Sequence, residues 1–250
     1  VVKLGIGLPA FVNDDSYVAY FTGEGAALED ARDYAIGGCL DGQLPGKSRT
    51  NATGMFVVPL VLEICMNDGY CHRIGRQIGP HTGTFDTFET FDDFMAAFKT
   101  QLQHFMALAA EEHNILLQAQ ADFFADPIHS SLMDGAIETG RDALSRSRPF
   151  ENGAILNPVG MINVADSMAA AKKLVFDERK VSADTLMKAL AANWKGYEHL
   201  QKMFFHAPKY GNGDAYVDSI ANELYGFWSN TAHSFRSIYG GAMKPAGISI

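Results

Sequence analysis

The sequence predicts an α/β protein dominated by long helices, and two observations lead to this. Over several long segments, apolar residues recur at three- and four-residue steps, which is the spacing of an amphipathic helix. Between them lie short apolar runs with the length of buried strands, such as residues 55–64 and 154–156. The chain has 250 residues, 47% of them hydrophobic, so it can bury the large core that such a fold needs.

The first expected elements are a turn or helix start at residues 13–15 (NDD) and a helix within residues 26–34. Gly37 and Gly38 are expected to end this helix, because glycine readily takes the positive φ of a helix C-terminus. Cys39 is therefore predicted to lie on a loop just past a helix end.

Residues 42–54 have the Gly, Pro, Ser, Thr and Asn content of a loop, and residues 55–64 read as a buried strand or the start of a helix. The clearest helix begins at Thr90, which with Asp93 forms a plausible capping box. Its apolar stripe, which we interpret as core packing, consists of Phe91, Phe94, Met95, Phe98, Leu102, Phe105 and Met106.

Three further helices are expected over residues 166–176, from Ser182 onward, and over residues 217–227. We find no internal repeat, low-complexity segment or linker. Residues 1–250 are therefore interpreted as a single, partial domain.

The charge and cysteine content exclude several classes of function. A net charge of -9 argues against nucleic-acid and anionic-membrane partners, which require clustered Lys and Arg. No run of eighteen apolar residues predicts a transmembrane helix, and no signal peptide is visible. Three cysteines do not make a disulfide framework, so a reducing cytoplasm is expected. The chain opens without an initiator Met, which favours a partial sequence.

Two segments resemble binding motifs, but each lacks residues that such a site requires. Residues 42–48 (GQLPGKS) look like a phosphate-binding loop, but Asp41 stands where its first glycine should be. Cys65, Cys71 and His72 lack both the spacing and the second ligand pair of a structural zinc site. We therefore expect no metal and no cofactor bound by these residues.

Cys39 and Asp41 are the stronger candidates for chemistry. Residues two apart in an extended loop point to the same side, so the thiol and the carboxylate would face one substrate. A nucleophilic cysteine needs a base or cationic neighbours, whereas the neighbours here are glycine, leucine and an acid. A neutral thiol beside a carboxylate suits hydrogen-atom chemistry better than nucleophilic attack.

Four segments in order give the chain a resemblance to the glycyl radical enzymes of the pyruvate formate-lyase-like superfamily. Residues 31–41 (ARDYAIGGCLD) resemble the stretch that leads to the family's catalytic Cys-x-Glu loop. Residues 163–176 (NVADSMAAAKKLVF) are similar to a family signature, and residues 193–198 (NWKGYE) and 207–214 (APKYGNGD) match two more. Residues 13–15 fit the segment before the cysteine helix.

The resemblance implies the second half of a ten-stranded α/β barrel, with long helices outside and a loop carrying Cys39 into its centre. It also implies that Cys39 becomes a thiyl radical that takes a hydrogen atom from a small-molecule substrate. In the family the radical is stored on a C-terminal glycine and installed by a separate S-adenosylmethionine iron–sulfur activase. An anaerobic organism, a cytoplasmic location and a homodimer of the full protein are implied as well.

The chain departs from the family pattern in two ways. The family's Arg-Val-x-Gly-Tyr segment, which holds the radical, is not found before Ile250, so we expect either a fragment or a non-catalytic, complementing piece. Asp41 also replaces the usual glutamate, and Gly42 replaces the proline common in dehydratases. Aspartate keeps the acid–base function but is one methylene shorter.

The sequence favours a radical lyase that cleaves a C–C bond, in the manner of arylacetate decarboxylases. Gly38 precedes Cys39, so the two adjacent cysteines of pyruvate formate-lyase proper are missing and acyl transfer is disfavoured. His72 lies, by its spacing from Cys39, where the decarboxylases place a substrate-contacting histidine, although a loop or core role is the plainer interpretation. The alternatives are a diol or hydroxyproline dehydratase, another C–X lyase, the complementing piece, and an unrelated α/β binding protein.

Overall fold

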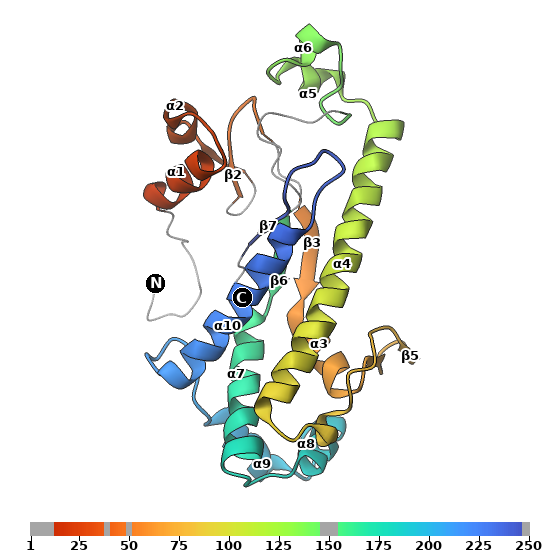
Figure 1. The fold of residues 1–250 in the computed structure, drawn as a ribbon, viewed down its shortest axis with the longest axis vertical. Helices are drawn as coiled ribbons and strands as arrows, with labels where there is room; N and C mark the ends of the chain where they lie inside the picture. The colour runs from red at the N-terminus through yellow and green to blue at the C-terminus, as the bar shows by residue number, and fades with distance from the viewer. Residues whose placement is uncertain (1–12, 38–40, 49–51, 146–154, 247–250) are drawn as a thin grey trace.

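The computed structural model of the chain describes residues 13–37, 41–48, 52–145 and 155–246 (Figure 1). Long helices run along the long axis of the molecule beside a small parallel sheet, and an N-terminal unit lies to one side. No helix within these ranges combines the length and the apolar character needed to cross a membrane.

The central sheet consists of three parallel strands, β3 (Ala52–Val57), β6 (Ile155–Val159) and β7 (Lys244–Pro245), in the order β3-β6-β7. Asn157 is the register partner of Met55, and Lys244 is the register partner of Ile155. Parallel strands need crossover connections, and long helical segments separate these three strands in the sequence.

The two faces of this sheet have different surroundings. Phe56 and Leu156 point toward the helices, where the Phe56 ring meets the edge of Trp228 at a centroid distance of 5.2 Å. Side chains alternate along a strand, so the intervening residues lie on the opposite side, where Met55 is 67% exposed. We call this side the open face; its residues from β3 and β6 are Met55, Val57, Ile155, Asn157 and Val159.

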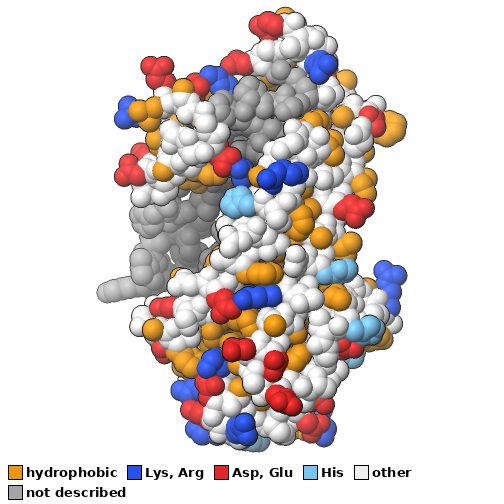
Figure 2. All heavy atoms as spheres, in the orientation of Figure 1, with side chains coloured by type: hydrophobic (Ala, Val, Ile, Leu, Met, Phe, Trp, Pro, Cys, Tyr) orange, Lys and Arg blue, Asp and Glu red, His pale blue; other side chains and the backbone are white. Residues whose placement is uncertain are grey.

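The main core lies between the sheet and its long helices. Helix α4 (Phe91–Phe123) begins at Thr90, whose side chain and that of Asp93 form the expected capping box. The inward stripe of α4 is buried, whereas its C-terminal half exposes apolar side chains along one edge of the molecule (Figure 2). The other helices of this core are α3 (Val58–Met66), α7 (Met161–Ala171) and α10 (Ala215–Ser234).

A π-helix, η3 (Lys172–Asp177), extends α7. Its widened turn directs Phe176 into an aromatic cluster, at centroid distances of 5.8 Å from Phe85 and 6.3 Å from Phe94. Lys172 donates to Asp177 at the two ends of this turn. The Lys-Lys-Leu-Val-Phe segment therefore places Phe176 in the aromatic part of the core.

The remaining elements of the body are short. They are β4 (Tyr70–Cys71), β5 (Arg76–Gln77), η2 (Phe85–Thr87), α5 (Pro127–Ser131), α6 (Ala136–Thr139), α8 (Ala183–Ala191) and α9 (Glu198–Phe205).

The N-terminal unit, residues 13–37 and 41–48, has a small core of its own. It consists of α1 (Asp14–Gly23), α2 (Leu28–Arg32), β1 (Ala35–Gly37) and β2 (Asp41–Gln43). Phe21 and Leu44 are each 1% exposed and hold the helices against the hairpin.

The structure confirms the helices expected from Asn13, Thr90 and Ser182, each of which supplies a side-chain N-cap. Residues 55–64 contain both of the expected alternatives, because β3 ends at Val57 and α3 begins at the next residue. The prediction that Gly37 ends a helix is wrong. Helix α2 ends at Arg32, and Gly37 instead belongs to a strand.

Candidate functional site

The candidate site is built on an antiparallel hairpin of β1 and β2. Gly37 pairs with Asp41, Ile36 with Gly42, and Ala35 with Gln43. Cys39, the predicted thiyl residue, lies outside the described residues, between the two strands in sequence. The hairpin therefore fixes the backbone on both sides of the segment that carries Cys39.

Asp41 is the first residue of the returning strand and is half-buried. The phenol of Tyr17, from α1, lies close to it. Burial raises the pKa of Tyr17, and the negative charge of Asp41 raises it further, because both disfavour a phenolate. Tyr17 thus keeps its phenol neutral near the Asp41 carboxylate.

Position 42 has room only for glycine, because the Tyr17 ring occupies the space that a side chain would take. A Cβ atom at position 42 would lie 2.5 Å from Cδ1 of Tyr17 and 3.2 Å from Cε2 of Phe21. Both rings come from α1, so the absence of a side chain at position 42 lets the helix lie directly on the hairpin.

A second phenol completes this packing. The rings of Tyr17 and Tyr34 stack at a centroid distance of 4.9 Å with an interplanar angle of 7°. The Tyr34 hydroxyl donates to Asp14, and this hydrogen bond is the main reason that the pKa of Tyr34 is raised to about 12. Asp14, with Arg32, also lines an open hollow of about 700 Å³ beside the hairpin.

His72 lies far from this hairpin. It lies between β4 and β5, whereas β2 lies on the opposite side of the molecule (Figure 1). His72 is exposed, its Nε2 is 3.0 Å from Oδ1 of Asn67, and its ring meets the edge of Tyr70. The structure therefore does not bring His72 together with Asp41.

The other motifs of the sequence have structural roles here. The Lys47 Nζ of the loop-like GQLPGKS segment donates to Asp30 at 2.6 Å, and the Ser48 hydroxyl accepts from the backbone N–H of Leu44. Cys65 is fully buried, and burial raises the pKa of its thiol to about 12. In the described part of the chain, no three His, Cys, Asp or Glu residues gather as metal ligands would.

The sequence interpretation missed Tyr17, Tyr34 and the ion pair between Glu24 and Lys244. Tyr17 and Glu24 are seven residues apart and so lie on one face of α1. That helical spacing was the available signal for their common role. The pairing with Lys244 spans 220 residues and has no local signal.

The fold has clear counterparts among solved structures. It matches the hydroxyproline dehydratase of Clostridioides difficile, crystallised with trans-4-hydroxy-L-proline, with a TM-score of 0.90 and 31% identity. The match covers 96% of this chain and 30% of that one. The fold is thus part of the α/β barrel of a glycyl radical enzyme, as predicted. Over residues 1–250 the sequence matches the family "Pyruvate formate lyase-like", and the chain belongs to this family.

The relatives of the chain include a dehydratase, a sulfite-lyase and a decarboxylase subunit. The chain is 33% identical to trans-4-hydroxy-L-proline dehydratase of Clostridioides difficile over 98% of its length, and 34% identical to isethionate sulfite-lyase of Oleidesulfovibrio alaskensis over 89%. It spans 31% and 27% of those two proteins. A 4-hydroxyphenylacetate decarboxylase glycyl radical subunit, also from Clostridioides difficile, is 26% identical.

Proposed function

We propose that the chain is the cysteine-bearing part of a glycyl radical lyase that eliminates water or another leaving group from a small polar substrate. The observation that carries this proposal is the pairing of Gly37 with Asp41, which holds a carboxylate beside the segment that contains Cys39. Family membership and the dehydratase and sulfite-lyase relatives support the same reaction class.

In this proposal Cys39 and Asp41 divide the chemistry. The Cys39 thiyl takes a hydrogen atom from a substrate carbon, so a C–H bond breaks, an S–H bond forms and a carbon radical remains. The Asp41 carboxylate accepts the proton of the hydroxyl or amine group on that carbon. The adjacent bond then breaks, the leaving group departs with the bonding electron pair, and it takes up the proton from Asp41.

The last step restores the starting state. The product radical takes a hydrogen atom from the Cys39 thiol, which becomes a thiyl again. A radical stored on a glycine of the complete protein, installed by an S-adenosylmethionine iron–sulfur activase, supplies the initial oxidising equivalent. The activase and a homodimer of the complete protein are part of the proposal.

Decarboxylation, the reaction that the sequence favours, is the second candidate. Its support was the position of His72 and the replacement of a proline by Gly42. His72 lies away from the hairpin, and the Tyr17 ring already accounts for the missing side chain at position 42. Because one relative is a decarboxylase subunit, arylacetates are included among the substrates tested below.

The test is to express the complete reading frame with an activase under anaerobic conditions. The glycyl radical is measured by electron paramagnetic resonance, and hydroxyproline, diols, isethionate and arylacetates are offered as substrates. We expect turnover of a hydroxylated or sulfonated substrate. Turnover of arylacetates alone would establish the second candidate, and failure to form any glycyl radical would overturn both.

Replacing Asp41 by Asn tests the acid–base role. We expect turnover to fall about 10²- to 10⁴-fold, because general acid–base catalysis contributes on that order. The glycyl radical signal should be unchanged. Asp33→Asn, at an exposed carboxylate just before the hairpin, is the matched control and should keep normal turnover. Normal turnover of the Asp41→Asn protein would show that the role is misassigned.

A further inference from the structure

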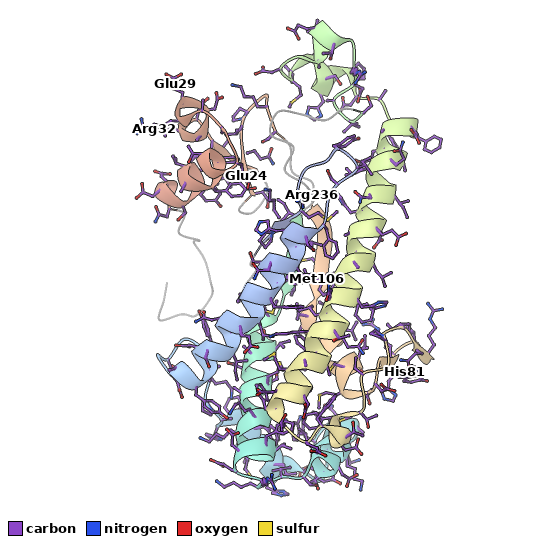
Figure 3. The ribbon with its side chains drawn as sticks, in the orientation of Figure 1. Glu24, Glu29, Arg32, His81, Met106 and Arg236 are labelled. Carbon is purple, nitrogen blue, oxygen red and sulfur yellow. The ribbon has the colours of Figure 1, made fainter. Side chains whose placement is uncertain are left out.

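An ion pair joins the N-terminal unit to the central sheet. The Lys244 ammonium, in β7, contacts the carboxylate of Glu24, the residue that caps the C-terminus of α1. In Figure 3 Glu24 lies on the side of the unit that faces the body, whereas Glu29 and Arg32 lie on its outer side. Within the described ranges, no other ion pair joins the N-terminal unit to the sheet.

Lys244 projects from the open face of the sheet. It is the register partner of Ile155, so the two side chains lie on the same side of the sheet. The Lys244 side chain is only 9% exposed. A buried ammonium is unfavourable unless it is paired, so Lys244 holds Glu24 in place more firmly than an exposed lysine would.

One face of α1 connects this ion pair to the candidate site. Tyr17, Phe21 and Glu24 follow one another at four and three residues, the spacing of a single helix face. Tyr17 and Phe21 lie directly against Gly42 of the hairpin, and Glu24 reaches the sheet. Helix α1 therefore links β7 to the hairpin through contacts along one face, with Tyr17 and Phe21 against the hairpin and Glu24 against Lys244.

We propose that Glu24 and Lys244 are positioning residues, which fix the hairpin of β1 and β2, and with it Asp41, relative to the open face of the sheet. This inference rests on the proposed function, because it assumes that the hairpin carries the reacting groups. Neither residue touches the reacting atoms. Their effect is on distance, and misplacement of reacting groups by about 1 Å lowers rates about 100-fold.

The test uses the complete protein with its activase, and compares Glu24→Gln, Glu24→Asp and the charge-reversed double variant Glu24→Lys/Lys244→Glu. For Glu24→Gln we expect kcat to fall about 10- to 100-fold, with KM and the glycyl radical signal close to wild type. The charge-reversed pair should recover most of the lost kcat, and Glu24→Asp should lie between. Asp184→Asn, which breaks the exposed Asp184–Lys188 pair, is the control and should change nothing.

A second double variant separates positioning from stability. Glu24→Gln/Lys244→Met removes both charges and leaves no buried ammonium, so the fold should be restored while kcat stays low. Recovery of kcat in this variant would mean that the pair only stabilises the fold, and would overturn the inference. Wild-type kcat in Glu24→Gln would overturn it as well.

Hydrogen exchange provides a measurement that needs no substrate. Peptides covering residues 35–37 and 41–43 should exchange faster in Glu24→Gln than in wild type or in Asp184→Asn. Unchanged exchange would contradict the inference even if no substrate is turned over. Absence of turnover in the wild-type protein would instead count against the proposed function.

Discussion

At the scale of single residues, the site depends on what surrounds the hairpin more than on the hairpin's own side chains. Gly42 is the clearest example, because the space of its missing Cβ is filled by Tyr17. Burial and the nearby charge of Asp41 raise the pKa of the Tyr17 phenol, which therefore stays neutral. Tyr17 and Gly42 therefore form a matched pair, and each restricts which residues the other position accepts.

Replacing Gly42 by Ala tests this pair. The new methyl group would displace the Tyr17 ring, and overpacking of this kind destabilises by about 1 to 3 kcal/mol. The free energy of unfolding, measured with urea, should fall by that amount. Gly226→Ala, within α10 and facing open space, is the control and should stabilise by up to about 1 kcal/mol, because alanine is the better helix former.

A double variant shows whether the clash is with Tyr17. Tyr17→Ser removes the ring, so Gly42→Ala should destabilise that protein far less than it destabilises the wild type. Residues in contact are expected to be non-additive in this way. Additive losses in the double variant would show that the alanine is rejected for another reason.

At the scale of elements, the sequence predicted best the helices that carry their own capping signals. Thr90 and Ser182 bind backbone N–H groups three residues ahead, so the signal and the structure lie within one turn. Strand β1 could not be predicted in this way. It has three residues and depends on pairing with β2, while Gly37, followed by Gly38 in the sequence, resembles a helix end.

The π-helix and the contact between the N-terminal unit and the sheet could not be predicted from the sequence either. The widened turn at Lys172–Asp177 depends on packing of Phe176 among aromatic rings that come from other elements. The contact between Glu24 and Lys244 depends on the fold of everything between them. The predicted roles of Cys39, Asp41 and His72 stay predictions.

The capping box of α4 gives a prediction for an element. Thr90→Ala removes the acceptor for the Asp93 N–H, and loss of such a cap costs about 1 kcal/mol, within a range of about 0.5 to 2 kcal/mol. Thermal or urea unfolding would measure it. Thr100→Ala, at an exposed position inside the same helix, is the control and should change stability by less than about 0.5 kcal/mol. Equal effects of the two changes would contradict the capping role.

At the scale of the whole molecule, net charge and local carboxylate contacts set the response to pH. The chain carries a net charge of -9, and Figure 2 shows its basic side chains scattered among acidic ones on the face in view. Several carboxylates are nevertheless stabilised in their charged form. Asp68 is an example: His81 contacts its Oδ2 at 2.7 Å, and the N–H groups of Thr82 and Gly83 donate to its Oδ1.

These contacts predict how the free energy of unfolding changes at acidic pH. The hydrogen bond from His81 and then that from the Gly83 N–H lower the pKa of Asp68 below its ordinary value of 3.8. Hydrogen bonds with Lys172 and then Tyr216 likewise lower the pKa of Asp177. A carboxyl group with a lowered folded pKa binds its proton more readily in the unfolded chain. Its contribution is therefore present above the unfolded pKa and is lost as the pH falls through the folded pKa.

Urea unfolding between pH 7 and pH 2.5 would measure this dependence for wild type and Asp68→Asn. The wild-type free energy of unfolding should be steady above pH 5 and then fall as the pH drops below about 4, because unfolding takes up protons there. Asp68→Asn should be less stable at pH 7 and should lose less on acidification, since it lacks one of the groups that take up a proton. Parallel curves for the two proteins would mean that the bonds to Asp68 do not contribute to folding. The loop at residues 79–83 would then be held by Gln101, whose side-chain amide donates to the Pro80 carbonyl and the Thr82 hydroxyl.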